Sequence, residues 1–101
     1  MIRHVVMWAF PEESAGRTRE DNVLRAFELL LALPDAIPVI RRFDVATDQL
    51  GGEKQAHLML DSDFDDWDAL ETYQQHPAHL EVVAFFRELG TTRLAVDHEV
   101  V

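Results

Sequence analysis

The chain has 101 residues, 48% of them hydrophobic, and no cysteine. The length predicts one domain, residues 1–101, and the lack of cysteine excludes disulfides and zinc–thiolate sites. The formal net charge of −10 disfavours binding to nucleic acid and to anionic membranes. No apolar run is long enough to span a bilayer, and no signal-peptide pattern is present, so we expect a cytoplasmic protein.

The first half of the chain predicts a strand, a helix and a second strand. Residues 2–10 (IRHVVMWAF) are rich in Val and aromatic residues, which is typical of a strand, and both faces of this strand are mostly apolar. Apolar residues recur at helical spacing over 18–33, and Pro34 ends that segment. Residues 39–46 form the second predicted strand, which a glycine-containing loop over 48–54 follows.

The second half predicts a strand, an interrupted helix and a last strand. Residues 55–60 alternate as in a strand. The acidic run 61–68 (DSDFDDWD) is interpreted as the start of a helix, because the helix dipole favours negative charge at that end. Pro77 interrupts this helix and serves as the first position of a second helical piece over 78–89. Residues 93–101 form the last predicted strand.

The predicted order of elements is β-α-β-β-α-β, which defines an α+β ferredoxin-like fold. Its four strands form one antiparallel sheet, and both helices cover one face of that sheet. The other face of the first strand is apolar, yet a chain of this length has no second layer to cover it. We therefore expect the protein to be a homodimer.

Four histidines and the only tyrosine are the candidate site residues: His4, His57, Tyr73, His76 and His79. Imidazole titrates with a pKa of about 6.5, so His79 could act as a base toward a proton next to a carbonyl. Tyr73 could orient His79 or polarise the carbonyl oxygen. Alternatively, these two residues pack around the helix break. His4 and His57 complete a pocket if they face the same space, and otherwise belong to the core; His76 lies on the helix surface or caps the break.

Neither a metal nor a cofactor is expected. His76 and His79 are three residues apart, but the proline between them disturbs the helical geometry that a shared ligand would require. Asp61, Asp63 and Asp65 resemble the start of a calcium loop, but the glycine and glutamate that such a loop requires are missing. No glycine-rich phosphate loop or dinucleotide fingerprint is present.

Three segments together resemble the Dabb family of stress-responsive dimeric α/β-barrel proteins. They are the opening residues 2–6 (IRHVV), the His-Pro-Ala-His motif over 76–79, and the closing residues 94–98 (LAVDH). The resemblance covers essentially the whole chain. It implies a homodimer in which two sheets pack face to face as a barrel, with the helices outside.

One branch of this family contains plant polyketide (olivetolic acid-type) cyclases, which close a linear polyketide by an intramolecular aldol reaction. The Tyr and the second His that carry this chemistry match Tyr73 and His79, while His4, His57 and His76 match further histidines of that branch. The resemblance implies a small, mostly apolar ligand in a His/Tyr-lined pocket and a cofactor-independent cyclase or lyase. The alternatives are a non-catalytic stress-related structural or binding protein and a cofactor-free oxygenase.

Overall fold

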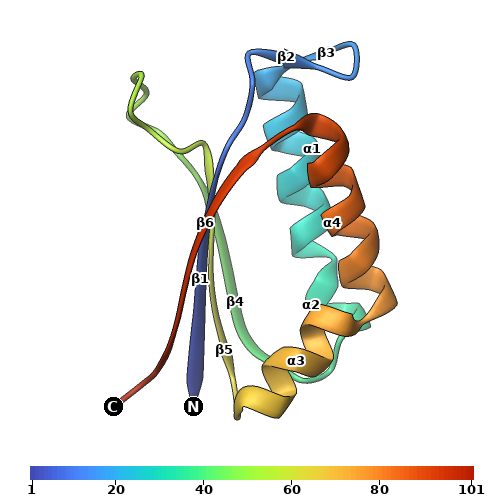
Figure 1. The fold of residues 1–101 in the computed structure, drawn as a ribbon, viewed down its shortest axis with the longest axis vertical. Helices are drawn as coiled ribbons and strands as arrows, with labels where there is room; N and C mark the ends of the chain where they lie inside the picture. Colours follow the sequence, from blue (N-terminus) through green and yellow to red (C-terminus); the bar gives the residue numbers. More distant parts are fainter.

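The computed structural model describes residues 1–101 as a four-stranded antiparallel sheet with helices on one face (Figure 1). The strands are β1 (Ile2–Ala9), β4 (Ile40–Thr47), β5 (Leu58–Phe64) and β6 (Thr92–Glu99), in the spatial order β4-β5-β1-β6. The helices are α1 (Arg19–Leu31), the short α2 (Leu33–Ala36), α3 (Trp67–Gln75) and α4 (Pro77–Leu89). The predicted ferredoxin-like fold is confirmed. No helix has the length and apolar character needed to cross a membrane.

β1 is a central strand that pairs with β5 on one side and with β6 on the other. Alternate side chains of a strand point to opposite faces, so every second residue of β1 faces the helices. These residues are buried together with their neighbours on β5: Ile2, His4, Val6 and Trp8 on β1, and Leu58, Leu60, Ser62 and Phe64 on β5. The edge strand β6, by contrast, is exposed along its whole length. The space between β6 and the helices is therefore not closed by the core.

The helix boundaries follow from capping residues and proline. The carboxylate of Asp66 accepts a hydrogen bond from the Ala69 N–H at 2.8 Å, which caps the start of α3. α3 ends at Gln75 and α4 starts at Pro77, so the predicted break is confirmed. Gly90 ends α4 with a φ of 71°, a left-handed conformation that strains other residues. The break holds α3 and α4 at an angle, and it places the end of α3 beside the start of α4 (Figure 1).

A short hairpin that the sequence did not predict lies between β1 and α1. Its strands are β2 (Glu13–Ser14) and β3 (Arg17–Thr18). Ala15 and Gly16 form the turn with φ angles of 53° and 75°, and a two-residue turn of this kind matches the twist of the flanking strands. The buried amide of Asn22 on α1 donates to the Ser14 carbonyl and accepts from the Arg17 guanidinium. These bonds hold the hairpin against the helix.

The interpretation of residues 61–68 as the start of a helix is wrong. β5 continues to Phe64, and α3 begins only at Trp67. Asp61 and Asp63 alternate with buried residues of β5, and their carboxylates bind arginines on neighbouring strands. The acidic run therefore serves two purposes: its first three aspartates pair with arginines on neighbouring strands, and its last two lie at the cap and in the first turn of α3. The third strand also starts later than predicted, at Leu58.

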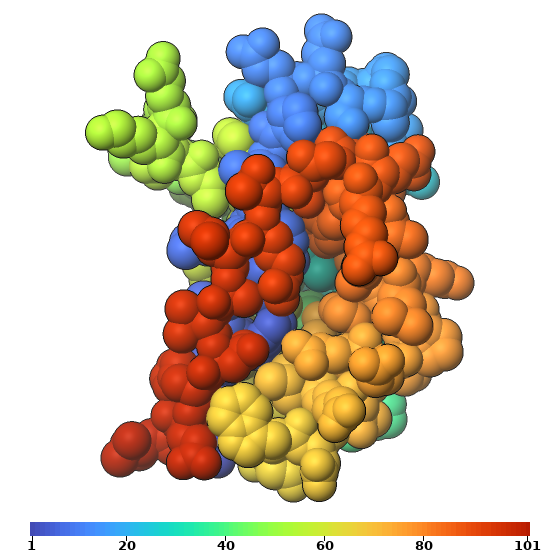
Figure 2. Space-filling model, in the orientation of Figure 1, coloured from blue at the N-terminus to red at the C-terminus, as the bar shows by residue number.

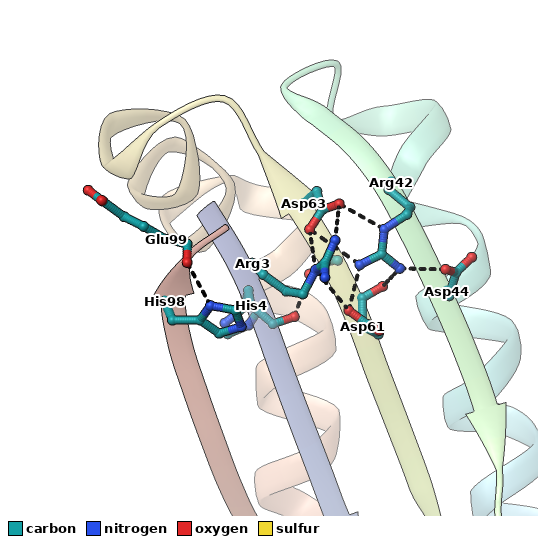
Figure 3. Close-up of polar contacts among 9 residues, drawn as sticks. Arg3, His4, Arg42, Asp44, Asp61, Asp63, His98 and Glu99 are labelled. Carbon is teal, nitrogen blue, oxygen red and sulfur yellow. Dashed lines mark hydrogen bonds and ion pairs between the residues drawn. The ribbon is translucent and has the colours of Figure 1, made fainter. Parts of the chain in front are cut away.

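The sheet face away from the helices carries a charged network at one end (Figure 3). Asp63 accepts from the Arg3 Nε at 2.9 Å and from the Arg42 Nε at 2.8 Å, and Arg42 also binds Asp61 and Asp44. The Arg3 and Arg42 guanidinium groups hold the pKa of Asp63 well below its usual range. Asp63 is only 5% exposed although no helix covers it, because the two arginines do. The charges of this cluster, defined as the sheet-face network, are largely satisfied within the chain.

The other part of the same face is apolar and uncovered. Met7, Leu94 and Val96 are 44%, 69% and 62% exposed. Met7 lies opposite Leu94 in the strand register and Val5 lies opposite Val96, so the side chains form one continuous patch. A monomer leaves this apolar sheet patch in water, which favours association through this face.

Candidate functional site

A cavity of about 280 Å³ lies between β1, β6 and the helices. Figure 2 shows a hollow there, between β6 in red and α4 in orange, with blue atoms of β1 at its floor. Most of its wall is apolar: Val6, Trp8, Leu30, Leu60, Val82, Val83 and Phe86. Its polar side chains are His4, Tyr73, His79, Arg87, Thr91 and Arg93. A mostly apolar wall with a few convergent polar groups is the usual composition of a small-molecule site.

His79 reaches this cavity from the first turn of α4. Its Nδ1 lies 3.0 Å from the Gln74 carbonyl oxygen. A carbonyl can only accept, so Nδ1 carries the hydrogen and Nε2 of the neutral ring keeps its lone pair. Burial lowers the pKa of His79, and the charges of His4 and Arg93 lower it further, against the opposing effect of the Gln74 bond. His79 is therefore a neutral imidazole with a free basic nitrogen at neutral pH.

Tyr73, in the last turn of α3, lies against His79, with the ring centroids 4.4 Å apart. Phe64 and Phe43 hold the other sides of the phenol ring, at centroid distances of 5.0 and 5.9 Å. The Tyr73 hydroxyl makes no hydrogen bond within the chain, and no fully buried polar side-chain atom is left without a partner. The hydroxyl therefore has access to the cavity. Burial raises the pKa of Tyr73, so the group stays protonated and acts as a hydrogen-bond donor.

His4 enters the same cavity from β1 and is 2% exposed. Its Nδ1 bonds the carboxylate of Asp97, which lies directly opposite on β6. A carboxylate accepts, so this bond fixes the hydrogen on Nδ1 and the orientation of the ring. The rings of His4 and Tyr73 lie in an edge-to-face arrangement with their centroids 6.1 Å apart. The structure thus brings together three of the five candidate residues.

The expectation that His57 lines the same pocket is wrong. His57 precedes β5 near the end of β1, where its Nδ1 accepts a hydrogen bond from the Phe10 N–H at 2.9 Å. Phe10 is six positions along the chain from His4, which corresponds to about 20 Å along a strand. His57 instead faces a separate, open hollow of about 430 Å³ beside the start of α1, together with Arg19 and Asp48. Burial lowers the pKa of His57, with Arg19 adding to this effect.

His76 lies outside the cavity as well. Its Nδ1 accepts from the Ala78 N–H at 3.0 Å, so the ring caps the start of α4, as one of the two sequence interpretations expected. His79 uses its own Nδ1 on the Gln74 carbonyl. No group of three or more His, Cys, Asp or Glu side chains in the chain is arranged to hold a metal ion.

Four polar residues of the site were not predicted from the sequence: Arg87, Thr91 and Arg93 on the cavity wall, and Asp97, which binds His4. Asp97 and Arg93 lie on β6 opposite His4 and Trp8, so their side chains share the helix-facing side of the sheet. Only the strand register places them there, and the sequence does not give that register. Without the register, charged residues on an edge strand are expected to lie in solvent.

The family described as the Stress responsive A/B Barrel Domain, Dabb, matches residues 2–100. The chain belongs to the Dabb family. An uncharacterized protein of Streptomyces coelicolor is 35% identical over 99 residues, covering 98% of this chain and 99% of that protein. The family resemblance read from the sequence is thereby confirmed.

Two similar proteins with crystal structures are described as dimeric proteins of unknown function with a ferredoxin-like fold. The protein from Bacteroides fragilis is 29% identical, with a TM-score of 0.80, over 98% of this chain and 95% of that chain. The protein from Thermobifida fusca is 26% identical, with a TM-score of 0.80, over 98% of this chain and 90% of that chain. The arrangement of strands and helices around the cavity is thus a shared fold.

The lowered pKa of His79 predicts a pH dependence of stability. The unfolded state has an ordinary His pKa of about 6.5, so it binds a proton before the folded state does as the pH falls. Above the unfolded pKa, His79 does not lower the free energy of unfolding. As the pH falls from there toward the folded pKa, His79 lowers the free energy of unfolding by an increasing amount. We expect the free energy of unfolding of His79→Gln to fall less between pH 7.5 and 5 than that of the wild type, measured by urea unfolding. His98→Gln, a change at an exposed ring, serves as the control; parallel curves for His79→Gln and the wild type would contradict the prediction.

Proposed function

We propose that this Dabb protein is a homodimer that binds a small, mostly apolar carbonyl compound and catalyses cofactor-independent cyclisation or a related lyase reaction. One observation carries the proposal: the unprotonated Nε2 of His79 and the protonated hydroxyl of Tyr73 belong to adjacent rings on one cavity. A base and a hydrogen-bond donor placed together are what enolisation of a carbonyl compound requires.

The reaction uses these two groups in turn. Nε2 of His79 removes a proton from the carbon next to a carbonyl, while the Tyr73 hydroxyl donates a hydrogen bond to the oxygen that becomes the enolate. The enolate carbon then attacks a second carbonyl carbon of the same molecule and forms the ring C–C bond. The resulting alkoxide takes back a proton from the imidazolium of His79. The apolar wall keeps water from the enolate, which strengthens both interactions.

His4 and Asp97 support this arrangement. The carboxylate of Asp97 fixes the ring of His4, which in turn packs edge-to-face with the ring of Tyr73. His4 thus contributes a positioned polar group to the cavity beside the phenol. His57 and His76 take no part in the proposed reaction, because neither ring lines the cavity.

The homodimer is supported by the uncovered sheet patch and by the dimeric state of the similar crystal structures. Pairing two such patches removes Met7, Leu94 and Val96 from water on both subunits. The helices and the cavity lie on the opposite face of each sheet, so such a dimer leaves them outside (Figure 1).

Native mass spectrometry of the purified protein tests both parts of the proposal. We expect a dimer that carries a small organic adduct, which is released on denaturation and identified by its mass. Val83→Phe adds volume to the cavity wall and should abolish the adduct, while the control Ala84→Phe on the exposed side of α4 should keep it. A monomer would contradict the dimer, and an adduct that survives Val83→Phe would contradict binding in this cavity.

A further inference from the structure

Two arginines on the wall of the cavity have no partner within the chain. The protein has 9 basic and 19 acidic residues, so cations find carboxylates easily. The other six arginines are all engaged: Arg3, Arg41 and Arg42 with aspartates, Arg17 with Asn22, Arg19 with the Phe10 carbonyl, and Arg25 over the Phe85 ring. The guanidinium groups of Arg87 and Arg93 make neither an ion pair nor a hydrogen bond, and both line the cavity of Tyr73 and His79.

The strand register aims Arg93 at the cavity. Arg93 lies opposite Trp8, whose side chain is buried on the helix side of the sheet, and opposite residues of paired strands share a face. Its charge also lowers the pKa of both Tyr73 and His79, which places the guanidinium within electrostatic reach of the two rings. Arg87 approaches from the last turn of α4. The cavity therefore combines an apolar floor with a cationic rim.

We propose that Arg93 and Arg87 select ligands that carry a carboxylate, so that the preferred ligand is a one- or two-ring keto acid or its open-chain precursor. The inference rests on the proposed function and names its substrate class. The stacked Trp8 and Phe86 rings, 4.7 Å apart, form an apolar surface for the body of the ligand. A guanidinium binds a planar carboxylate through two parallel hydrogen bonds, which gives orientation as well as affinity.

The size and polarity of the cavity favour a carboxylate over a phosphate. The volume of about 280 Å³ is at the lower end of the range for ligand pockets, and most of its wall is apolar. A singly charged, compact carboxylate loses less hydration there than a phosphate dianion does. A bound carboxylate also offsets the field of Arg93 at His79. The base should thus become stronger when the correct ligand is bound.

The experiment compares two probes of nearly the same shape, the anionic 4-acetylbenzoate and the neutral 4-acetylbenzamide. Their dissociation constants for the purified full-length protein are measured at pH 7.5 by NMR chemical-shift titration. We expect the wild type to bind the benzoate at least about tenfold more tightly than the amide, as one charge-assisted contact supplies. Arg93→Gln should weaken binding of the benzoate much more than binding of the amide and so remove most of this preference, and Arg87→Gln with Arg93→Gln should remove it entirely. Arg25→Gln, a change of an arginine outside the cavity, should keep it.

A second readout follows the ring of His79 itself. Saturating benzoate should raise the midpoint of the His79 proton titration in the NMR spectrum, and the amide should not. Equal binding of both probes would overturn the carboxylate inference and leave the proposed ligand cavity standing. A preference that persists without both arginines would also overturn it. Binding of neither probe would count against the proposed cavity function and against this inference together.

Discussion

The variant His79→Ala is expected to lose turnover by about 10²–10⁴-fold, which is the usual contribution of a positioned general base. The ring is the only group on the cavity that combines a free lone pair with a backbone bond that fixes its hydrogen. The methyl protons of 4-acetylbenzoate exchange with D₂O only when a base removes them, so NMR measures this step directly. The wild type should catalyse the exchange and His79→Ala should not.

Folding of this variant should change little. The change removes one hydrogen bond, to the Gln74 carbonyl, worth about 1 kcal/mol, while α4 keeps its cap at His76. The melting temperature and the dimer should therefore stay close to those of the wild type. Loss of folding would instead support a packing role for His79.

Two further variants test whether the proton exchange takes place in the cavity of Tyr73 and His79. Tyr73→Phe keeps the ring contacts and removes only the hydroxyl, so we expect slower exchange with an almost unchanged melting temperature. His57→Ala should exchange at the wild-type rate, because His57 faces the other hollow. Exchange lost in His57→Ala but kept in His79→Ala would move the site to that hollow. Oxygen uptake with an electron-rich aromatic substrate would favour the oxygenase alternative.

The fold could be predicted from the sequence because each element carries its own period. The Val and aromatic residues of β1 and the helical spacing along α1 are local signals, and Pro77 marks a break that the structure confirms. The interpretation of the acidic run 61–68 as a helix start was wrong because the state of these residues depends on contacts with distant strands. The buried carboxylate of Asp63 is satisfied within the strand by Arg3 and Arg42, and neither contact is visible from neighbouring residues in the sequence.

The site was predictable in part. Tyr73 and His79 belong to one motif around one helix break, so local geometry brings them together. The positions of Asp97 and His57 depend on how strands align that are separated by more than forty residues of chain. A shift of one residue in this register moves every side chain of a strand to the opposite face. The sequence therefore identified the helical half of the cavity and left the sheet half incomplete.

The double variant Leu94→Glu with Val96→Glu is expected to convert the dimer to a folded monomer. Both side chains are exposed on the uncovered face of β6, at 69% and 62%. A two-fold interface uses the same patch on each subunit, so two substitutions introduce four carboxylates. Burying an unpaired carboxylate costs several kcal/mol, and the sheet-face network already pairs its arginines with Asp61 and Asp63. The dissociation constant should rise by at least about 10³-fold.

The monomer should remain folded because no residue of β6 belongs to the buried core. Sedimentation equilibrium measures the change in assembly, and circular dichroism checks the fold. Leu31→Glu is a matched control, since Leu31 is 48% exposed but lies on α1, in the helix layer. This control should stay a dimer. A dimer that survives both glutamates would show that the subunits associate through another surface and not through the apolar sheet patch.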